Sequence, residues 1–279
     1  MDAVIAVACV ALVLAQAAVL NAGGRERSKR EVCLANLRSL ASAWQTYFND
    51  NKGKIPVGDV WYSWDFPITS GGPQLAWVEY PHVWPHPMPP TRTTQQASLG
   101  HPATQADYQH AIAEGTMWKY VGDYDIYRCP DGDKDQYVTY SMSNSMNCYP
   151  NTGGTSSQPS PGFTNINQIA RPNERFLFLD TGVAKMGAFY IPYTEMGALW
   201  WGDLPPVRHG MGTTFVFADG HTEYRKWTDP HALKAIETNG WLDPAVGPDN
   251  CDCDLRWLSK ITWGNVPYSC TNPNKHCEY

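Results

Sequence analysis

The first hydrophobic stretch of the chain is long enough to cross a membrane. Residues 3–24 contain no charge, and Gln16 is the only polar side chain within the first 18 of them. In a helix these 22 residues extend about 33 Å, against a hydrocarbon core of about 30 Å. A cleaved signal peptide would begin with basic residues, which Met1 and Asp2 do not supply. The pattern therefore predicts a hydrophobic transmembrane helix over residues 1–24, with an alanine-rich core helix as the alternative.

An amphipathic helix follows the uncharged run. Over residues 25–52, apolar side chains recur at spacings of three and four, which places them on one helical face. They are Cys33, Leu37, Leu40, Ala41, Trp44, Tyr47 and Phe48. Gly23 and Gly24 weaken a helix by roughly 1 kcal/mol each relative to alanine, so they mark a kink, a melted stretch or a tolerated site. We expect this segment to continue the first helix.

The second half of the chain has the alternation typical of β-strands. Residues 213–225 alternate on either side of Asp219 and Gly220, a dipeptide that favours a two-residue hairpin turn. Residues 175–179 and 137–142 are two further predicted strands. The predicted fold class is α+β: a long N-terminal hydrophobic α-helix whose C-terminal half packs on a small antiparallel β-sheet head with long loops.

Composition adds aromatic loops and argues against a nucleic-acid partner. With 21 basic and 27 acidic residues, the chain has a formal charge of -6. Many of its 12 tryptophans and 22 prolines fall in an insertion-like region at residues 57–117. This region either offers aromatic platforms to a sugar or a neighbouring subunit, or only locks a long loop onto the head. The expected divisions are 1–24 (hydrophobic segment), 25–52 (amphipathic segment), 53–227 (globular head) and 228–279 (Cys-rich extension).

Short motifs along the chain resemble those of bacterial type IV pilin-like proteins. The opening Met1-Asp2-Ala3-Val4-Ile5 is similar to the start of such a subunit after its usual Phe-Thr-Leu, with Asp2 where the family normally has Glu. The Cys-x-x-Asn-Leu-Arg segment and the closing signature resemble those of prepilin-like proteins of the His-x9-Asp-Gly type. The matching residues are Cys33, Asn36, Leu37 and Arg38, Arg128-Cys129-Pro130, Tyr140-Ser141-Met142-Ser143-Asn144, Arg171-Pro172-Asn173-Glu174, Phe178-Leu179-Asp180, and His209 with Asp219-Gly220.

The resemblance implies a structural subunit that polymerises through its N-terminal helix into an extracellular type IV pilus-like or pseudopilus filament. Before assembly it would be anchored in the inner membrane, and afterwards it would form a periplasmic or surface filament. Its partners would be further copies of itself and the pilus or type II secretion assembly machinery. The residues expected to matter for assembly are Met1, Asp2, Gly23, Gly24, Arg25 and Arg27. The alternatives are a minor pseudopilin of a type II secretion system and a membrane-anchored polysaccharide-binding protein.

The cysteines indicate an oxidising compartment. Seven of the eight lie beyond the hydrophobic run. The basic cluster after residue 24 would by itself keep the head cytoplasmic, but the resembled family loses a basic leader before assembly, so we give the cysteines more weight. We favour a pairing of Cys33 with Cys129, which would tie the helix to the loop entering the sheet. The cysteines expected to staple the C-terminal extension are Cys251, Cys253, Cys270 and Cys277. Sequence alone leaves the connectivity open.

Two groups of residues are candidate metal ligands. Asp131, Asp133 and Asp135 place carboxylates at alternate positions, as in a loop that binds Ca²⁺, although the other positions of an EF-hand loop do not match. The alternative is a solvated acidic turn. Asp180, His209, Asp219 and His221 would suit Zn²⁺ if they converged, while turn chemistry explains Asp219 and a hydrogen bond explains His209 equally well. A structural Ca²⁺ is thus the leading cofactor hypothesis.

No established catalytic motif is present in the sequence. Gly-x-Ser-x-Gly, His-Glu-x-x-His and a phosphate-binding loop are all missing. The cysteines form no Cys-x-x-Cys pair, so redox catalysis has no support either. We therefore expect a protein that is not an enzyme.

Overall fold

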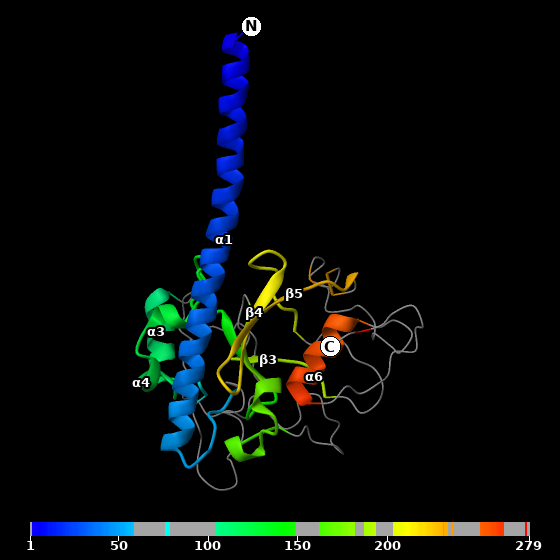
Figure 1. Cartoon of the computed structure of the whole chain (residues 1–279). Coiled ribbons are helices and arrows are strands. Elements are labelled where there is room, and N and C mark those ends of the chain that lie inside the picture. Colours follow the sequence, from blue (N-terminus) through cyan, green and yellow to red (C-terminus); the bar gives the residue numbers. More distant parts are fainter. Residues whose placement is uncertain are drawn as a thin grey trace, which may run out of the picture.

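A single long helix and a five-stranded sheet organise the molecule. The computed structural model describes residues 2–58, 76–78, 104–148, 162–181, 187–193, 203–230, 232–233, 236, 252–264 and 277, with the backbone alone for residues 2–22. Helix α1 (Asp2–Asp50) is continuous for 49 residues. Figure 1 shows its N-terminal half projecting from the head, by which we mean the sheet and the helices around it.

The prediction of a membrane-spanning helix is contradicted by the structure. No helix in the described part of the chain combines enough length with enough apolar character to traverse a bilayer. Over residues 23–50, where side chains are described, six of the seven residues from 25 to 31 are charged, and Arg25, Glu26 and Arg27 are exposed. This density of charge is incompatible with a hydrocarbon environment. The fold is therefore α+β with one long helix, and the described part of the chain does not show the membrane-spanning hydrophobic helix that we expected.

The C-terminal half of α1 is amphipathic, as predicted, and packs on the sheet. Its helical periodicity puts one row of side chains into the core, where they are at most 1% exposed: Cys33, Leu37, Leu40, Ala41 and Trp44. The helix runs through Gly23 and Gly24 without interruption, so the glycine pair is tolerated. It ends at Asp50, beyond which Gly53 has a φ of 79° and donates its N–H to the carbonyl of Phe48 at 2.8 Å.

The sheet is mixed, which corrects the prediction of an antiparallel sheet. Its strands are β1 (Tyr140–Ser143), β2 (Phe176–Asp180), β3 (Ala188–Phe189), β4 (Gly212–Phe217) and β5 (Thr222–Lys226). Their order is β3-β1-β2-β4-β5, and β1 pairs in parallel with β3 while the other pairs are antiparallel. The three predicted strand regions correspond to β1, β2 and the β4–β5 hairpin. Strand β3 is only two residues long, too short to give a recognisable sequence pattern.

The β4–β5 hairpin closes over three residues instead of the two that we predicted. Val216 pairs with Thr222, and the N–H of Phe217 donates to the carbonyl of His221 at 2.9 Å, which leaves residues 218–220 as the loop. Gly220 has a φ of 93°, the left-handed conformation that three-residue hairpin loops require at this position.

Small helices complete the α1 side of the head. They are α3 (Gln105–Glu114), α4 (Trp118–Val121), η1 (Tyr124–Tyr127), η2 (Ile166–Gln168) and η3 (Pro172–Glu174). In the insertion-like region, Trp77 is fully buried and its indole stacks on Tyr127 with ring centroids 5.9 Å apart. Trp118 stacks on Tyr124 and packs against the same core. These two tryptophans therefore build the head, while Trp61, Trp64 and Trp84 lie outside the described residues.

A second helical layer covers the other face of the sheet. Helix α6 (Cys253–Trp263) buries Leu255, Leu258 and Ile261 in a core shared with Phe176, Phe215 and other residues of the sheet. Neighbouring residues of β4 alternate between the two cores: Phe215 faces the α6 side, and Val216 the α1 side. Figure 1 shows α1 and α6 with the sheet between them. Because both faces are covered, β2 and β4 are buried along their whole length.

Candidate functional site

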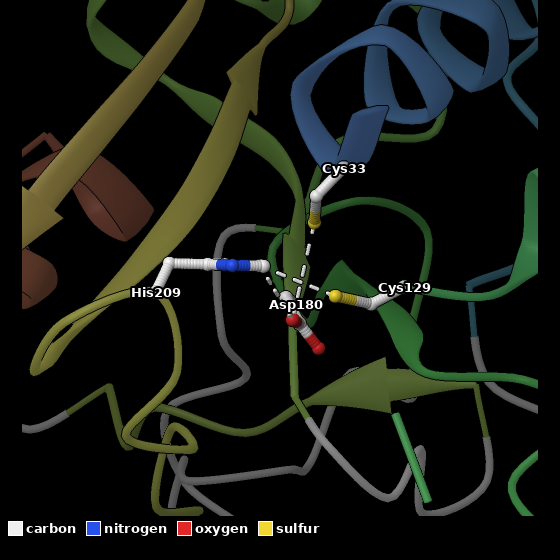
Figure 2. Close-up of side chains that lie close together, drawn as sticks. All are labelled: Cys33, Cys129, Asp180 and His209. Atoms are coloured by element: carbon white, nitrogen blue, oxygen red, sulfur yellow. Dashed lines mark hydrogen bonds and ion pairs between the residues drawn. The ribbon is translucent and has the colours of Figure 1, made fainter. Parts of the chain in front are cut away.

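Four side chains from distant parts of the sequence meet beneath α1. Cys33 lies on α1, Cys129 follows η1, Asp180 ends β2, and His209 precedes β4. One sulfur, nitrogen or oxygen atom from each lies within 4.8 Å of the others. Figure 2 shows the four side chains pointing toward one point. Cys33, Cys129 and Asp180 have no exposed surface, and His209 is 5% exposed.

Helix α1 positions both cysteines. Cys33 belongs to the buried row of the helix, and Asn36 lies one turn further along. The Asn36 side-chain amide donates to the carbonyls of Asp125 and Arg128 at 3.2 and 3.0 Å. These contacts hold the segment that carries Cys129 against the helix. The Cys-x-x-Asn spacing thus places a thiol and a loop-binding amide side by side on one helical face.

A tight loop presents His209. Arg208 and Gly212 exchange both of their backbone hydrogen bonds, at 3.2 and 3.0 Å. Between them, His209, Gly210 and Met211 have φ angles of 55°, 85° and 74°. Left-handed backbone at residues other than glycine costs free energy and often occurs at functional sites. The conformation brings Nε2 of His209 to 3.2 Å from Sγ of Cys129 and 3.9 Å from Oδ2 of Asp180.

The two oxygens of Asp180 have different surroundings. Oδ1 accepts a hydrogen bond from the guanidinium of Arg208 at 3.0 Å. Oδ2 faces the interior of the cluster, where Sγ of Cys33 lies 3.9 Å away. The guanidinium therefore compensates the charge of the buried carboxylate and leaves its second oxygen directed at the sulfur and nitrogen atoms.

Hydroxyl groups surround the sulfur of Cys33. The phenol of Tyr140 donates to Sγ at 3.2 Å, and the hydroxyl of Thr214 lies 3.0 Å from the same atom. Both residues belong to the sheet, so its α1-facing surface stabilises negative charge on this sulfur.

Interactions within the cluster perturb the pKa values of its members. Burial opposes ionisation of Cys33, but hydrogen bonds with Cys129 and His209 outweigh it and lower the pKa of Cys33 to about 7. The hydrogen bond with Cys33, followed by burial, raises the pKa of Cys129. For His209, burial favours the neutral ring, yet the hydrogen bond and charge of Cys33 produce a net increase in pKa. The pKa shifts of Cys33 and His209 thus both go toward the charged form, as expected for a thiol and an imidazole that interact with each other.

The arrangement differs from a nucleophilic Cys-His-Asp triad. In a triad the acid binds one ring nitrogen and the nucleophile contacts the other. Here Nε2 of His209 faces both Cys129 and Asp180. The carboxylate nearest to Nδ1, that of Asp131, is 3.9 Å away and makes no hydrogen bond with it, so the groups surround one point and do not form a relay. Burial also leaves no surface for a substrate to reach the sulfurs. The geometry suits the coordination of an ion better than it suits catalysis.

Among the described residues, the three carboxylates predicted to bind Ca²⁺ are not gathered into one group of potential ligands. Lys29 donates to Oδ1 of Asp131 at 2.6 Å, while the amide of Gln136 donates to Oδ2 of Asp133 at 2.8 Å. Asp133 and Asp135 are exposed, and neither belongs to a group of potential metal ligands among the described residues. Asp131 does form such a group with Glu26 and His209, but the ammonium of Lys29 already pairs with both carboxylates, at 2.6 Å from Asp131 and 3.9 Å from Glu26.

The second predicted set of metal ligands divides in two. Asp180 and His209 join the buried cluster, whereas Asp219 and His221 form a separate pair on the hairpin loop, with Nδ1 of His221 2.6 Å from Oδ1 of Asp219. Asp219 also accepts the N–H of His221 at 3.1 Å, which is ordinary turn chemistry. The hairpin residues therefore contribute nothing to the cluster.

The cysteines also depart from the expected pairing. Cys33 and Cys129 are close together but are not joined by a disulfide. Cys253 and Cys277 are joined by a disulfide, while Cys251 and Cys270 lie outside the described residues. Because Cys33 and Cys129 were predicted to form a bridge, the sequence did not single them out as potential metal ligands. The available signal was that Cys33, Cys129, Asp180 and His209 all lie in the short segments that resemble one family.

The residues expected to act in assembly are only partly described. Met1 lies outside the described residues, and Asp2 begins α1 with its backbone alone described. Gly23, Gly24, Arg25 and Arg27 are exposed on α1 where it leaves the head. Comparison with known proteins adds no further assignment: no family model matches the chain, and no curated protein or solved structure is significantly similar to it.

Proposed function

We propose that this protein is a structural subunit that assembles into an extracellular filament through the projecting half of α1. The observation that carries the proposal is the shape of the molecule. One helix of 49 residues, about 74 Å long at 1.5 Å per residue, has only its C-terminal half packed on the sheet. Its N-terminal half extends away from the head in Figure 1.

The sequence of the projecting half supports burial against other helices. Residues 3–24 contain no charge, and a helix without a polar face is stable only when its surroundings cover it. Equivalent helices from further copies of the chain can supply that cover. Side-by-side packing of this kind joins different surfaces of neighbouring copies and does not close, so it generates a helical filament. The proposal requires no membrane-spanning segment.

Two features of the head support a structural role outside the cytoplasm. The Cys253–Cys277 disulfide is typical of proteins in oxidising compartments. The cluster beneath α1 is buried, with His209 at 5% exposure and its three other members at 0%, which is typical of groups that hold a fold together. A long pilus and a short pseudopilus would share this geometry and would differ in filament length.

Substitution within the projecting half tests the proposal. We expect the full-length wild-type chain to form filaments visible by negative-stain electron microscopy of material sheared from the surface of producing cells. Val10→Arg would bury a charge among packed helices and should abolish the filaments. Val10→Leu at the same position keeps the apolar character and should preserve them.

The head provides the internal control for this experiment. Neither substitution touches the sheet, so the near-ultraviolet circular dichroism and the melting temperature of the head should match those of the wild type. A wild-type chain that remains monomeric, or Val10→Arg filaments indistinguishable from those of Val10→Leu, would contradict the proposal.

A further inference from the structure

We propose that Cys33, Cys129, Asp180 and His209 bind one zinc ion that fastens α1 to the head. The proposal concerns the four-residue cluster alone and is independent of filament assembly. It follows from the convergence of four donor atoms within 4.8 Å of one another in a fully buried position.

The donor set selects the kind of ion. Two thiolates, one imidazole and one carboxylate are ligands that Zn²⁺ accepts in tetrahedral sites, while Ca²⁺ and Mg²⁺ require oxygen ligands. With Zn–S near 2.3 Å and Zn–N or Zn–O near 2.0 Å, the edges of such a tetrahedron measure roughly 3.2–3.8 Å. The observed separations of 3.2, 3.9 and 3.9 Å between donor atoms are already close to this range.

The second ring nitrogen of His209 supports coordination through the first. Nε2 points into the cluster, and the buried Nδ1 makes no hydrogen bond among the described residues. Oδ2 of Asp131 lies 3.9 Å from Nδ1. Zinc-bound histidines usually direct their other ring nitrogen at a carboxylate or carbonyl, which fixes the orientation of the ring. Asp131 is placed to fill that role once the ring engages a metal.

The charges around the site balance when zinc is bound. Two thiolates and the Asp180 carboxylate carry three negative charges, which Zn²⁺ and the guanidinium of Arg208 neutralise together. The guanidinium of Arg208 donates to Oδ1 of Asp180 at 3.0 Å, while Oδ2 lies 3.9 Å from both Sγ of Cys33 and Nε2 of His209. A buried site with no net charge avoids the desolvation cost of an uncompensated ion.

A disulfide between the two cysteines explains less of the structure. It would use the sulfurs but give no reason for Asp180 and His209 to converge on them from β2 and the loop before β4. Coordination accounts for the position of all four side chains. It also accounts for the left-handed backbone that holds His209 in place. The ligands also come from separate segments, so one ion would bind α1 to both the η1 loop and the sheet.

Metal analysis of the full-length chain tests the assignment. We expect protein purified anaerobically without chelators to contain about one zinc ion per chain, measured by inductively coupled plasma mass spectrometry. Cobalt added to the zinc-free protein should produce the intense visible absorption of a tetrahedral site and the thiolate charge-transfer bands of two cysteines. Cys129→Ser and Asp180→Asn should each greatly reduce bound zinc.

Two further variants separate coordination from general damage. Cys148→Ser removes a buried thiol that contacts the backbone carbonyls of Ser143 and Met146, away from the cluster, and should leave the zinc content unchanged. Asp131→Asn keeps all four ligands but weakens the support of His209, and we expect about 10- to 100-fold weaker zinc affinity. The wild-type cobalt spectrum remains informative if a ligand variant fails to fold.

Three results would overturn the proposal. The first is a folded wild-type chain that binds neither zinc nor cobalt. The second is a Cys33–Cys129 disulfide in peptides from the protein as isolated, identified by mass spectrometry without reduction. The third is a cobalt spectrum that lacks thiolate charge transfer, because it would place the metal elsewhere.

Discussion

The phenol of Tyr127 is the clearest case of an imperfectly satisfied group in the core. Its side chain is fully buried against Trp77, and its hydroxyl has no hydrogen-bond partner among the described residues. Because a buried, unpaired hydroxyl loses its water contacts without compensation, Tyr127→Phe should stabilise the protein by about 1 kcal/mol. Urea unfolding near neutral pH measures this difference.

The same substitution should have a larger effect at alkaline pH. Burial raises the pKa of Tyr127 well above its usual range. The unfolded chain therefore releases the phenolic proton more readily, and wild-type stability is lost as pH rises above about 10. The Phe variant lacks this loss, so its advantage should widen between about pH 8 and pH 10.5.

Tyr140→Phe is the matched control at the residue scale. The hydroxyl of Tyr140 is also buried but donates to Sγ of Cys33 at 3.2 Å. Its removal should destabilise the protein by about 1 kcal/mol, opposite in sign to the change at Tyr127. A Tyr127→Phe variant that is less stable than the wild type would show that the hydroxyl has a partner.

At the scale of elements, a single carboxylate holds the N-terminus of α6 to the hairpin. Asp254 is fully buried and accepts hydrogen bonds from the guanidinium of Arg225 at 3.0 Å and from the N–H groups of Thr228 and Asp229 at 2.7 and 2.8 Å. The guanidinium of Arg225 also lies over the ring of Trp257, 4.1 Å from its centroid. This arrangement links β5 to the second helical layer.

Asp254→Asn should therefore loosen α6. The change removes the charge that compensates Arg225 and replaces one acceptor oxygen by a donor, so we expect a loss of about 3 kcal/mol in unfolding free energy. Glu223→Gln, on an exposed position of the same hairpin, should change stability by less than about 0.5 kcal/mol. Equal stabilities of the two variants in urea unfolding would refute this role for Asp254.

Local sequence patterns predicted individual helices and strands, but they could not predict the contacts between segments that are distant in the sequence. The spacing of Cys33, Leu37 and Trp44 predicts the buried face of α1 because helical periodicity is a local property. The parallel pairing of β1 with β3 joins residues about 46 positions apart, and no local pattern encodes it.

Helix α6 was not predicted, because its segment was interpreted as a C-terminal extension held by disulfides. The spacing of Leu255, Leu258 and Ile261 is nevertheless helical.

The four-residue cluster could be predicted only in part, because its members come from segments that are distant in the sequence. Asp180 and His209 were recognised as metal-type residues by their chemistry, yet so were Asp219 and His221, and spacing could not separate the two pairs. The fold separates them: β4 (Gly212–Phe217) runs between His209 and Asp219, so the two pairs lie at opposite ends of that strand. Cys33 and Cys129 join the cluster only because α1 packs across the sheet.

At the scale of the whole molecule, the two helical layers are constrained by different chemistry. The proposed zinc ion links α1 to the sheet from one side, and the Cys253–Cys277 disulfide constrains α6 on the other. The disulfide closes a segment with a sequence separation of 24, for which loop-closure entropy predicts about 3 kcal/mol of stabilisation. Since the sheet lies between the layers, each link should act mainly on its own helix.

Hydrogen exchange of the full-length chain can resolve the two links. Removing zinc should reduce amide protection in residues 33–44 of α1 and in residues 124–129 around η1, because the ion's four ligands then lose their common partner. Reducing the disulfide should reduce protection in residues 253–263 and leave α1 unchanged. Cys277→Ser should abolish the response to reductant but retain the response to zinc. If both helices instead respond equally to both treatments, the head opens as one cooperative unit, and neither link acts on its own layer.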